Sequence, residues 1–225
     1  DVVQAAVRLP AGSAATAVRV LGPEGQMVPA QVLGSEGGVT TVLFLARVPS
    51  CGFAVYDVQP AETLLDHDTG LTIDGTSMEN RRYRVTLNDS GDAASIFDKQ
   101  LSHELLSAPI VLAFTHDAPG YWPAWNIDWE DQRQPPFAYV DGAADITVVE
   151  DGPLRVALEV TRKAQGSTFR QRISLSAGGA GERVEFGDVI DWRGTSCNLK
   201  AIFPLAASNP PVSYTHLRAH ETKAN

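Results

Sequence analysis

Apolar and polar residues alternate with a period of two over several long stretches of the chain. Successive side chains of a β-strand point to opposite faces of a sheet, so this spacing predicts strands with one buried and one solvated face. The residues predicted to share the buried face are Tyr83, Val85 and Leu87; Val156, Leu158 and Val160; Phe169, Ile173 and Leu175 together with the polar Gln171; and Val184, Phe186, Ile190 and Trp192.

A sustained apolar stripe with a period of 3.6 residues is not found in the sequence. The best helical stretch, Ile96–Leu106, is short, and we interpret it as a turn that joins two strands. Short strands are expected earlier in the chain, around Ala17–Leu21, Gln31–Leu33, Thr41–Arg47 and Phe53–Val58. With 19 Gly and 14 Pro between short strands, the sequence predicts an all-β fold.

The composition changes near residues 60–76, which predicts a boundary between two units. We expect a small β-sandwich domain at residues 1–60, a linker at 61–76 and a large β-sandwich at 77–210. From residue 211 the strand pattern is lost and the sequence becomes basic and His-rich. Residues 211–225 are therefore expected to be a disordered or foreign tail, and the large sandwich to be truncated.

Net charge, apolar runs and cysteine content limit which partners and which disulfide bonds are expected. A net charge of −9 argues against nucleic acid, since binding to phosphates needs clustered Lys and Arg. The local cluster Arg81, Arg82 and Arg84 is interpreted as a solvated edge. No apolar run approaches the roughly 20 residues that span a bilayer. Cys51 and Cys197 are expected to be buried free thiols, although a bridge between them stays open.

The stretch PGYWPAWNIDWEDQ, residues 119–132, contains three of the four tryptophans beside several carboxylates. The apolar face of a sugar stacks on aromatic rings, while its hydroxyl groups need carboxylate and amide partners. The candidate carbohydrate contacts are Tyr121, Trp122, Trp125, Asn126 and Asp128. Alternatively, Trp122 and Trp125 insert into the sandwich and anchor a long loop.

Other candidate sites are weaker. The pairs His67–Asp68 and His116–Asp117 each offer one nitrogen and one oxygen ligand, but Asp beside His is also common in turns. His216 and His220 have helical spacing but lie in the unusual tail and lack the glutamate of a metalloprotease motif. The sequence has no nucleophile elbow, phosphate loop or Cys-x-x-Cys pair. We therefore expect no catalytic residue and no metal site in this chain.

Five stretches of the sequence carry a resemblance to a known family. They are VRVLGPEGQMVPAQVLG (18–34), VLFLARVPSCGFAVYDV (42–58), TSMENRRYRVTLNDSGDAASIFDKQLSHELL (76–106), PGYWPAWNIDWED (119–131) and VEFGDVIDWRGTSCNLKAIFPLAASNP (184–210). In this order they resemble the C-terminal β-domains of glycoside hydrolase family 38 alpha-mannosidases. In that family the third stretch opens a large sandwich with a galactose-mutarotase-like fold, and the first two belong to a small β-domain before it. The fourth is similar to a "WDAWxID" loop, with Pro123 where the family often has Asp.

The resemblance implies the function of a longer parent enzyme that hydrolyses alpha-linked mannose with retention. Its zinc ion, nucleophile and acid/base carboxylate belong to an N-terminal barrel followed by helical domains, so these domains and an alpha-mannoside are the implied partners. THDAPG (115–120) superficially resembles the zinc-ligand motif but falls inside the sandwich, so we reject it as a zinc site. Alternatives are a stand-alone carbohydrate-binding β-sandwich module and, last, a mutarotase-like epimerase.

Overall fold

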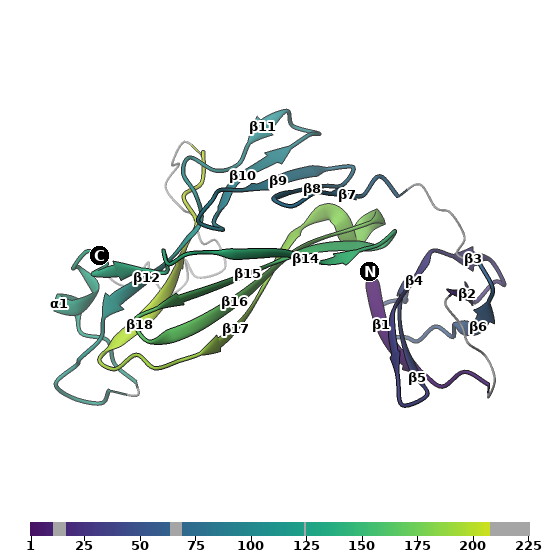
Figure 1. Ribbon diagram of the computed structural model, residues 1–225, viewed down its shortest axis with the longest axis horizontal. Coiled ribbons are helices and arrows are strands. Elements are labelled where there is room, and N and C mark those ends of the chain that lie inside the picture. The colour runs from purple at the N-terminus through teal and green to yellow at the C-terminus, as the bar shows by residue number, and fades with distance from the viewer. Residues whose placement is uncertain (11–16, 64–68, 124, 208–225) are drawn as a thin grey trace, which may run out of the picture.

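The computed structural model describes residues 1–10, 17–63, 69–123 and 125–207, and these residues form an all-β protein of antiparallel sheets (Figure 1). The predicted fold class is confirmed. Within the described residues the helical elements are one turn of α-helix, α1 (Trp129–Gln132), and one 3-10 segment, η1 (Gly178–Glu182).

The first 61 residues form two small sheets that face one another across an apolar core. One sheet has the order β1-β5-β4 and the other β3-β2-β6, and both contribute to a core around Val20, Val42 and Phe44. We call this part the small unit. Its strands are β1 (Val2–Val7), β2 (Ala17–Leu21), β3 (Met27–Val28), β4 (Ala30–Glu36), β5 (Val39–Leu45) and β6 (Asp57–Ala61).

Two strands of the small unit differ from the sequence prediction. β1 was not predicted, because all its residues except Gln4 are Val or Ala and give no clear alternation; it forms by pairing with β5. The strand expected at Phe53–Val58 begins only at Asp57, where pairing with β2 starts. Before that point Phe53 and Val55 face solvent, and the Tyr56 hydroxyl holds the chain by accepting from Arg47 N and donating to Arg47 O.

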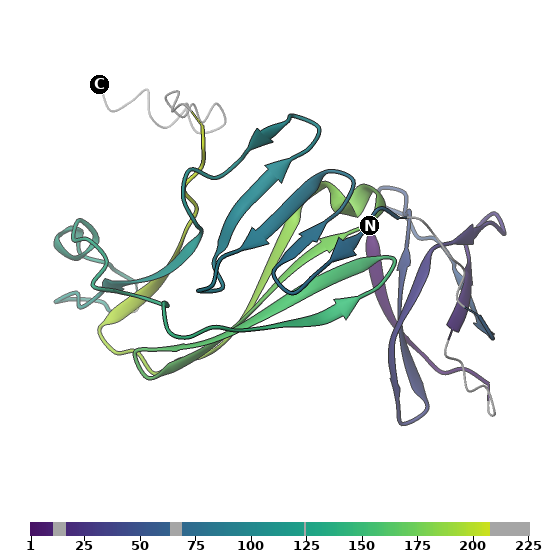
Figure 2. The ribbon, with the colours of Figure 1, turned by 45° about the horizontal axis from the view of Figure 1, so that its top comes forward.

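Most of the remaining described residues form a two-layer sandwich. A sheet of order β11-β10-β9-β8-β7 lies over a sheet of order β14-β15-β16-β17 (Figures 1 and 2). Its strands are β7 (Thr72–Ile73), β8 (Ser77–Glu79), β9 (Tyr83–Leu87), β10 (Ala93–Asp98), β11 (His103–Glu104), β14 (Asp145–Asp151), β15 (Arg155–Ala164), β16 (Ser167–Ser176) and β17 (Val184–Asp191).

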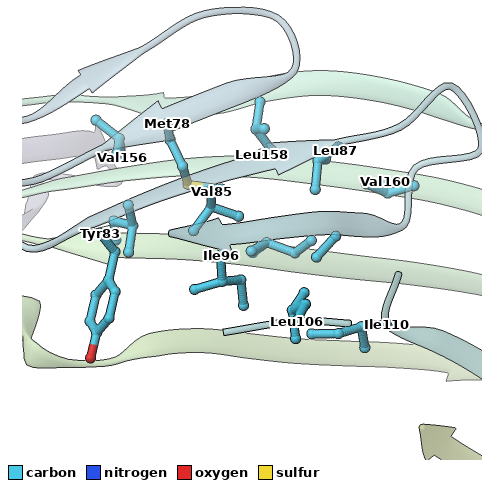
Figure 3. Close-up of a cluster of buried hydrophobic side chains, with 13 residues drawn as sticks. Met78, Tyr83, Val85, Leu87, Ile96, Leu106, Ile110, Val156, Leu158 and Val160 are labelled. Atoms are coloured by element: carbon cyan, nitrogen blue, oxygen red, sulfur yellow. The ribbon is translucent and has the colours of Figure 1, made fainter. Parts of the chain in front are cut away.

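The core of the sandwich is built by the alternating residues that the sequence singled out. Figure 3 shows Val85 and Leu87 of the upper sheet facing Leu158 and Val160 of the lower one. Ile173 completes the set and is fully buried. Burying each such side chain contributes about 1.5–3 kcal/mol, so this layer supplies a large share of the driving force for folding.

The stretch Ile96–Leu106 joins two strands through a turn, as expected, although the strands extend into it. β10 ends at Asp98 and β11 begins at His103. The Asp98 carboxylate accepts from the backbone N–H groups of Gln100 and Leu101 and pairs with Arg82 at 3.2 Å. Arg82, whose side chain is still 28% exposed, therefore also supports a buried carboxylate, a role that the interpretation of Arg81, Arg82 and Arg84 as a solvated edge did not include.

A buried asparagine joins the two layers at the end of β8. Asn80 Oδ1 accepts from Arg82 N at 2.8 Å and Tyr83 N at 2.7 Å. Its Nδ2 donates to Ser176 O at 3.1 Å and Gly181 O at 2.9 Å. One side chain thus closes the turn into β9 and ties it to the end of β16 and to η1.

The small unit contacts the sandwich through a buried glutamine. Gln31 Nε2 donates to Glu150 Oε1 at 3.0 Å, and Gln31 Oε1 accepts from the backbone N–H groups of Leu154 at 3.0 Å and Arg155 at 3.1 Å. Beside it, Leu43 and Leu154 form an apolar cluster that spans the two parts. These contacts fix the small unit at one end of the sandwich (Figure 1).

Candidate functional site

The aromatic loop, which we define as residues 119–132, lies at the end of the molecule opposite the small unit (Figures 1 and 2). It connects β12 (Val111–His116) to β13 (Ala138–Tyr139), and α1 forms its last turn. β12 and β13 belong to a third sheet, of order β13-β12-β18, with β18 at Cys197–Ile202. The loop therefore projects from this sheet and not from the main sandwich.

An aromatic cluster forms the base beneath the loop. Phe114 on β12 is fully buried, and its ring lies 5.9 Å from that of Phe169, 5.6 Å from Trp192 and 6.1 Å from Phe137. The His116 ring lies against Phe137 at 4.8 Å. Offset and edge-on aromatic pairs of this kind are favourable beyond their buried area, so both ends of the loop leave a rigid base.

Two aspartates brace the loop internally. Asp131 Oδ2 accepts from Ala118 N at 2.8 Å, and Asp128 Oδ2 accepts from Gly120 N at 3.2 Å. Asp128 Oδ1 also accepts from the Asn126 amide at 2.6 Å. The carboxylates thus replace the backbone partners that an irregular loop lacks, and they hold its start against its end.

The aromatic side chains of the loop face solvent. Tyr121 is 80% exposed, Trp122 75%, Trp125 90% and Trp129 71%. The alternative in which Trp122 and Trp125 insert into the sandwich is therefore wrong. The core of the third sheet is already filled by Phe114, and the braces turn the indoles outward.

The backbone at Trp122 supports a functional reason for this exposure. Trp122 has φ = 58°, in the left-handed region that costs a residue with a large side chain energy. Its carbonyl accepts from Trp125 N and Asn126 N, both at 2.9 Å, which closes a tight turn. The loop thus retains backbone strain while it presents three indoles to solvent.

The polar candidates of the loop are largely engaged within it. Asp128 and Asn126 bond to each other, and Glu130 forms an ion pair with Arg133. Retaining hydrolysis of a glycoside needs two carboxyl groups about 5–5.5 Å apart, one of them a nucleophile. Carboxylates that accept from backbone N–H groups serve a structural role, so the arrangement is suited to stacking on a ligand and not to hydrolysis.

The remaining sequence candidates do not assemble into a site. His116 packs on Phe137, and its neighbour Asp117 lies near Cys197. Burial raises the pKa of the Cys197 thiol, and the Asp117 carboxylate raises it further. Both cysteines are free, but Cys51 is exposed, so the expectation that both thiols are buried was wrong for Cys51.

Among the residues that the structure describes, no three His, Cys, Asp or Glu side chains come together in a group that could bind a metal ion. The pair His67–Asp68 and both His216 and His220 lie outside the described residues. Within the described part of the chain, no helix is long and apolar enough to cross a membrane.

Sequence reasoning missed two aromatic residues beside the candidate set. Trp129, in α1, is nearly as exposed as Trp122, and Phe137 is 45% exposed beside the base of the loop. Trp129 lies in the same aromatic-rich stretch, which was the signal that could have added it to the candidates. Phe137 follows two prolines, and nothing in the local pattern distinguishes it.

A comparison with the profiles of protein families identifies the family to which this chain belongs. The profile of the glycosyl hydrolases family 38 C-terminal domain matches residues 78–221, more than half of the chain. The chain belongs to this family. No curated protein matches it. The matched region begins on β8 and includes the sandwich except β7, the third sheet and the aromatic loop, so these are parts of a family 38 C-terminal domain, the non-catalytic region of a family 38 hydrolase.

Proposed function

We propose that this chain is the non-catalytic C-terminal region of a retaining alpha-mannosidase, and that its aromatic loop contacts the mannoside. The observation that carries the proposal is the exposed and braced set of indoles in a family 38 C-terminal domain. An indole offers a flat apolar face to the C–H side of a sugar ring. Such a loop adds binding energy near a reaction centre without taking part in bond cleavage.

The proposed parent enzyme carries its chemistry elsewhere. A zinc-containing barrel and helical domains are the expected neighbours, and no described residue cluster here suits zinc. In this organisation the strands up to β6, which ends at Ala61, form the small β-domain, and the strands from β7 (Thr72–Ile73) onward form the large sandwich, so the linker is shorter than the expected 61–76. The role of the chain is to pack on those domains and to extend the aromatic loop to the rim of the sugar site.

The assignment to an alpha-mannosidase is tested at the level of the gene and the purified chain. The reading frame upstream of Asp1 is expected to encode a barrel with paired His and Asp zinc ligands. The purified chain is expected to release no product from an aryl alpha-mannoside, with or without added zinc. Turnover at a rate typical of enzymes, or an upstream frame with an unrelated domain, contradicts the proposal.

A stand-alone carbohydrate-binding module is the second candidate, and the extreme exposure of Trp125 favours it. An aromatic platform that works without other domains would bind extended glycans. The two candidate functions are distinguished by how strongly the chain is retarded in gels that contain mannan, compared with gels that contain a beta-glucan. Strong retardation by mannan together with an upstream frame lacking a barrel favours the module.

A further inference from the structure

The aromatic loop carries carboxylates whose charge no basic side chain balances. Among the described residues, Asp128 and Asp131 accept hydrogen bonds from backbone N–H groups and from the amide of Asn126, which are all neutral donors. Asp117, two residues before the loop, has a buried oxygen without a hydrogen-bond partner and forms no ion pair within the described part of the chain. These three side chains therefore place negative charge around the exposed rings, and the hydrogen bonds to the backbone hold two of them there.

Positive charge is scarce in this part of the chain. Arg133 is the only Arg or Lys between Asp117 and Arg155, and its guanidinium is already paired with Glu130. That ion pair contributes no net charge. The unbalanced carboxylates consequently set the sign of the local electrostatic potential, which is negative like the net charge of −9 of the whole chain.

The aromatic rings favour the same sign of ligand charge. Within the described part of the loop, none of the four exposed rings lies against another ring or under a guanidinium, so their faces are open to a ligand. The face of an aromatic ring carries the negative part of its quadrupole and attracts cations. The rings and the carboxylates thus both oppose an anionic group on a sugar that stacks here.

We propose that the aromatic loop selects its glycan by charge. It binds mannosides that are neutral or carry an ammonium group, and it excludes those that carry phosphate, sulfate or carboxylate groups. Asp117, Asp128 and Asp131 determine this specificity through their electric field, without a direct hydrogen bond to the charged group of the ligand. This inference rests on the proposed function, because it names the class of ligand for the same loop.

Three forms of an alpha-linked mannobiose test the selection, with a hydroxyl, an ammonium or a phosphate group at C6 of the terminal residue. Tryptophan fluorescence of the full chain measures each dissociation constant. At low salt, with a Debye length of about 30 Å, the phosphate group, which has a charge of about −1.5 to −2, should weaken binding by about tenfold relative to the hydroxyl form. The ammonium form should bind about threefold more tightly than the hydroxyl form. At high salt, with a Debye length of about 3 Å, the three constants should agree within about twofold.

The double variant Asp117→Asn, Asp131→Asn isolates the contribution of the carboxylates. Asparagine retains an oxygen that can accept from Ala118 N, while the negative charge is removed. At low salt the ratio between the phosphate and hydroxyl constants should fall from about tenfold to about threefold. A change that only loosened the loop would weaken all three ligands alike and leave this ratio unchanged.

The matched control is Glu24→Gln with Glu36→Gln, which also removes two exposed carboxylates, but from the small unit at the opposite end of the molecule (Figures 1 and 2). It should leave the ratio unchanged, because these positions are remote from the loop. A phosphate form that binds as tightly as the hydroxyl form at low salt, a preference that persists at high salt, or an equal effect of the control overturns the proposal. A hydroxyl form that does not saturate the fluorescence change is a different result, since it refutes sugar binding itself and this inference with it.

Discussion

Gln31 offers the sharpest test of how the small unit is joined to the sandwich. Its side chain is 6% exposed and makes three hydrogen bonds across the junction. The Glu150 carboxylate that it contacts is also buried and receives Arg155 Nε at 2.9 Å as well as Arg172. Gln31→Ala removes the glutamine amide and leaves two backbone N–H groups and one carboxylate oxygen without these partners.

The expected loss of stability in Gln31→Ala follows from the number of hydrogen bonds that the substitution removes. Each hydrogen bond contributes about 1 kcal/mol net, and a buried group left without a partner costs about 1–3 kcal/mol. Gln31→Ala should therefore lower the free energy of unfolding by about 3 kcal/mol, less if water enters the space. Urea unfolding followed by circular dichroism measures this change. The control is Gln59→Ala, whose hydrogen bond to Asp57 is exposed to solvent and whose loss should cost less than about 0.5 kcal/mol.

Gln31→Glu adds a pH signature that a merely steric effect would not produce. The new carboxylate would face Glu150 Oε1, and two adjacent carboxylates raise the pKa of one of them. The folded variant would then bind more protons than the unfolded chain, so its stability should increase as the pH falls from about 7 to about 5. A cost for Gln31→Ala below about 0.5 kcal/mol, or no pH dependence in Gln31→Glu, would refute this account of the junction.

Three further predictions concern the sandwich and the two cysteines. Asn80→Asp should lower the free energy of unfolding by about 2–4 kcal/mol, because a carboxylate would face the two carbonyl groups that now accept hydrogen bonds from Asn80 Nδ2. Urea unfolding measures this loss, and the control is Asn88→Asp, in an exposed turn. Stability should decline as the pH falls below about 4.5, because two glutamates have a lowered pKa in the folded state. The pKa of Glu79 is lowered chiefly by its hydrogen bond with Arg84. Burial raises the pKa of Glu104, but hydrogen bonds from Ser95, Leu106 and Ile96 outweigh this effect and lower it. These carboxylates stabilise the fold above their unfolded pKa values and lose that contribution as pH falls through the lower folded values; a Glu104→Gln variant should show a shallower decline, and an equal decline contradicts the assignment. A thiol reagent should label exposed Cys51 quickly and Cys197 slowly, since burial raises the pKa of Cys197; equal rates would contradict the described geometry.

Local alternation was enough to predict β9, β15, β16 and β17, but not β8, β10 or β14, and not the long-range partners of any of them. β9, β15 and β16 follow from residues such as Val85, Leu158 and Ile173, because one face of each strand is buried. The contact between Gln31 and Glu150 joins residues 119 positions apart, and no local pattern indicates it. β17 has the same alternation as its neighbours, yet it is an edge strand, so its second half is not covered.

The composition of the aromatic loop was predictable, but its exposure was not. Trp122 and Trp125 suit a buried anchor as well as a ligand platform, since both uses need large apolar rings. What decides between them is the pairing of Asp128 and Asp131 with backbone N–H groups, together with a base already filled by Phe114. These are tertiary contacts, which depend on where β12 and β13 place the ends of the loop.

Titration of the chain with an alpha-linked mannobiose, followed by tryptophan fluorescence, tests the central claim most directly. Three of the four tryptophans lie in the aromatic loop, so binding there should change the emission with a dissociation constant on the order of millimolar, about −4 kcal/mol. Trp122→Ala and Trp125→Ala should each abolish saturation, while Trp192→Phe, in the base, should retain it. A linear response of the unaltered chain, or saturation that survives both alanine variants, would contradict the claim that this loop contacts the sugar.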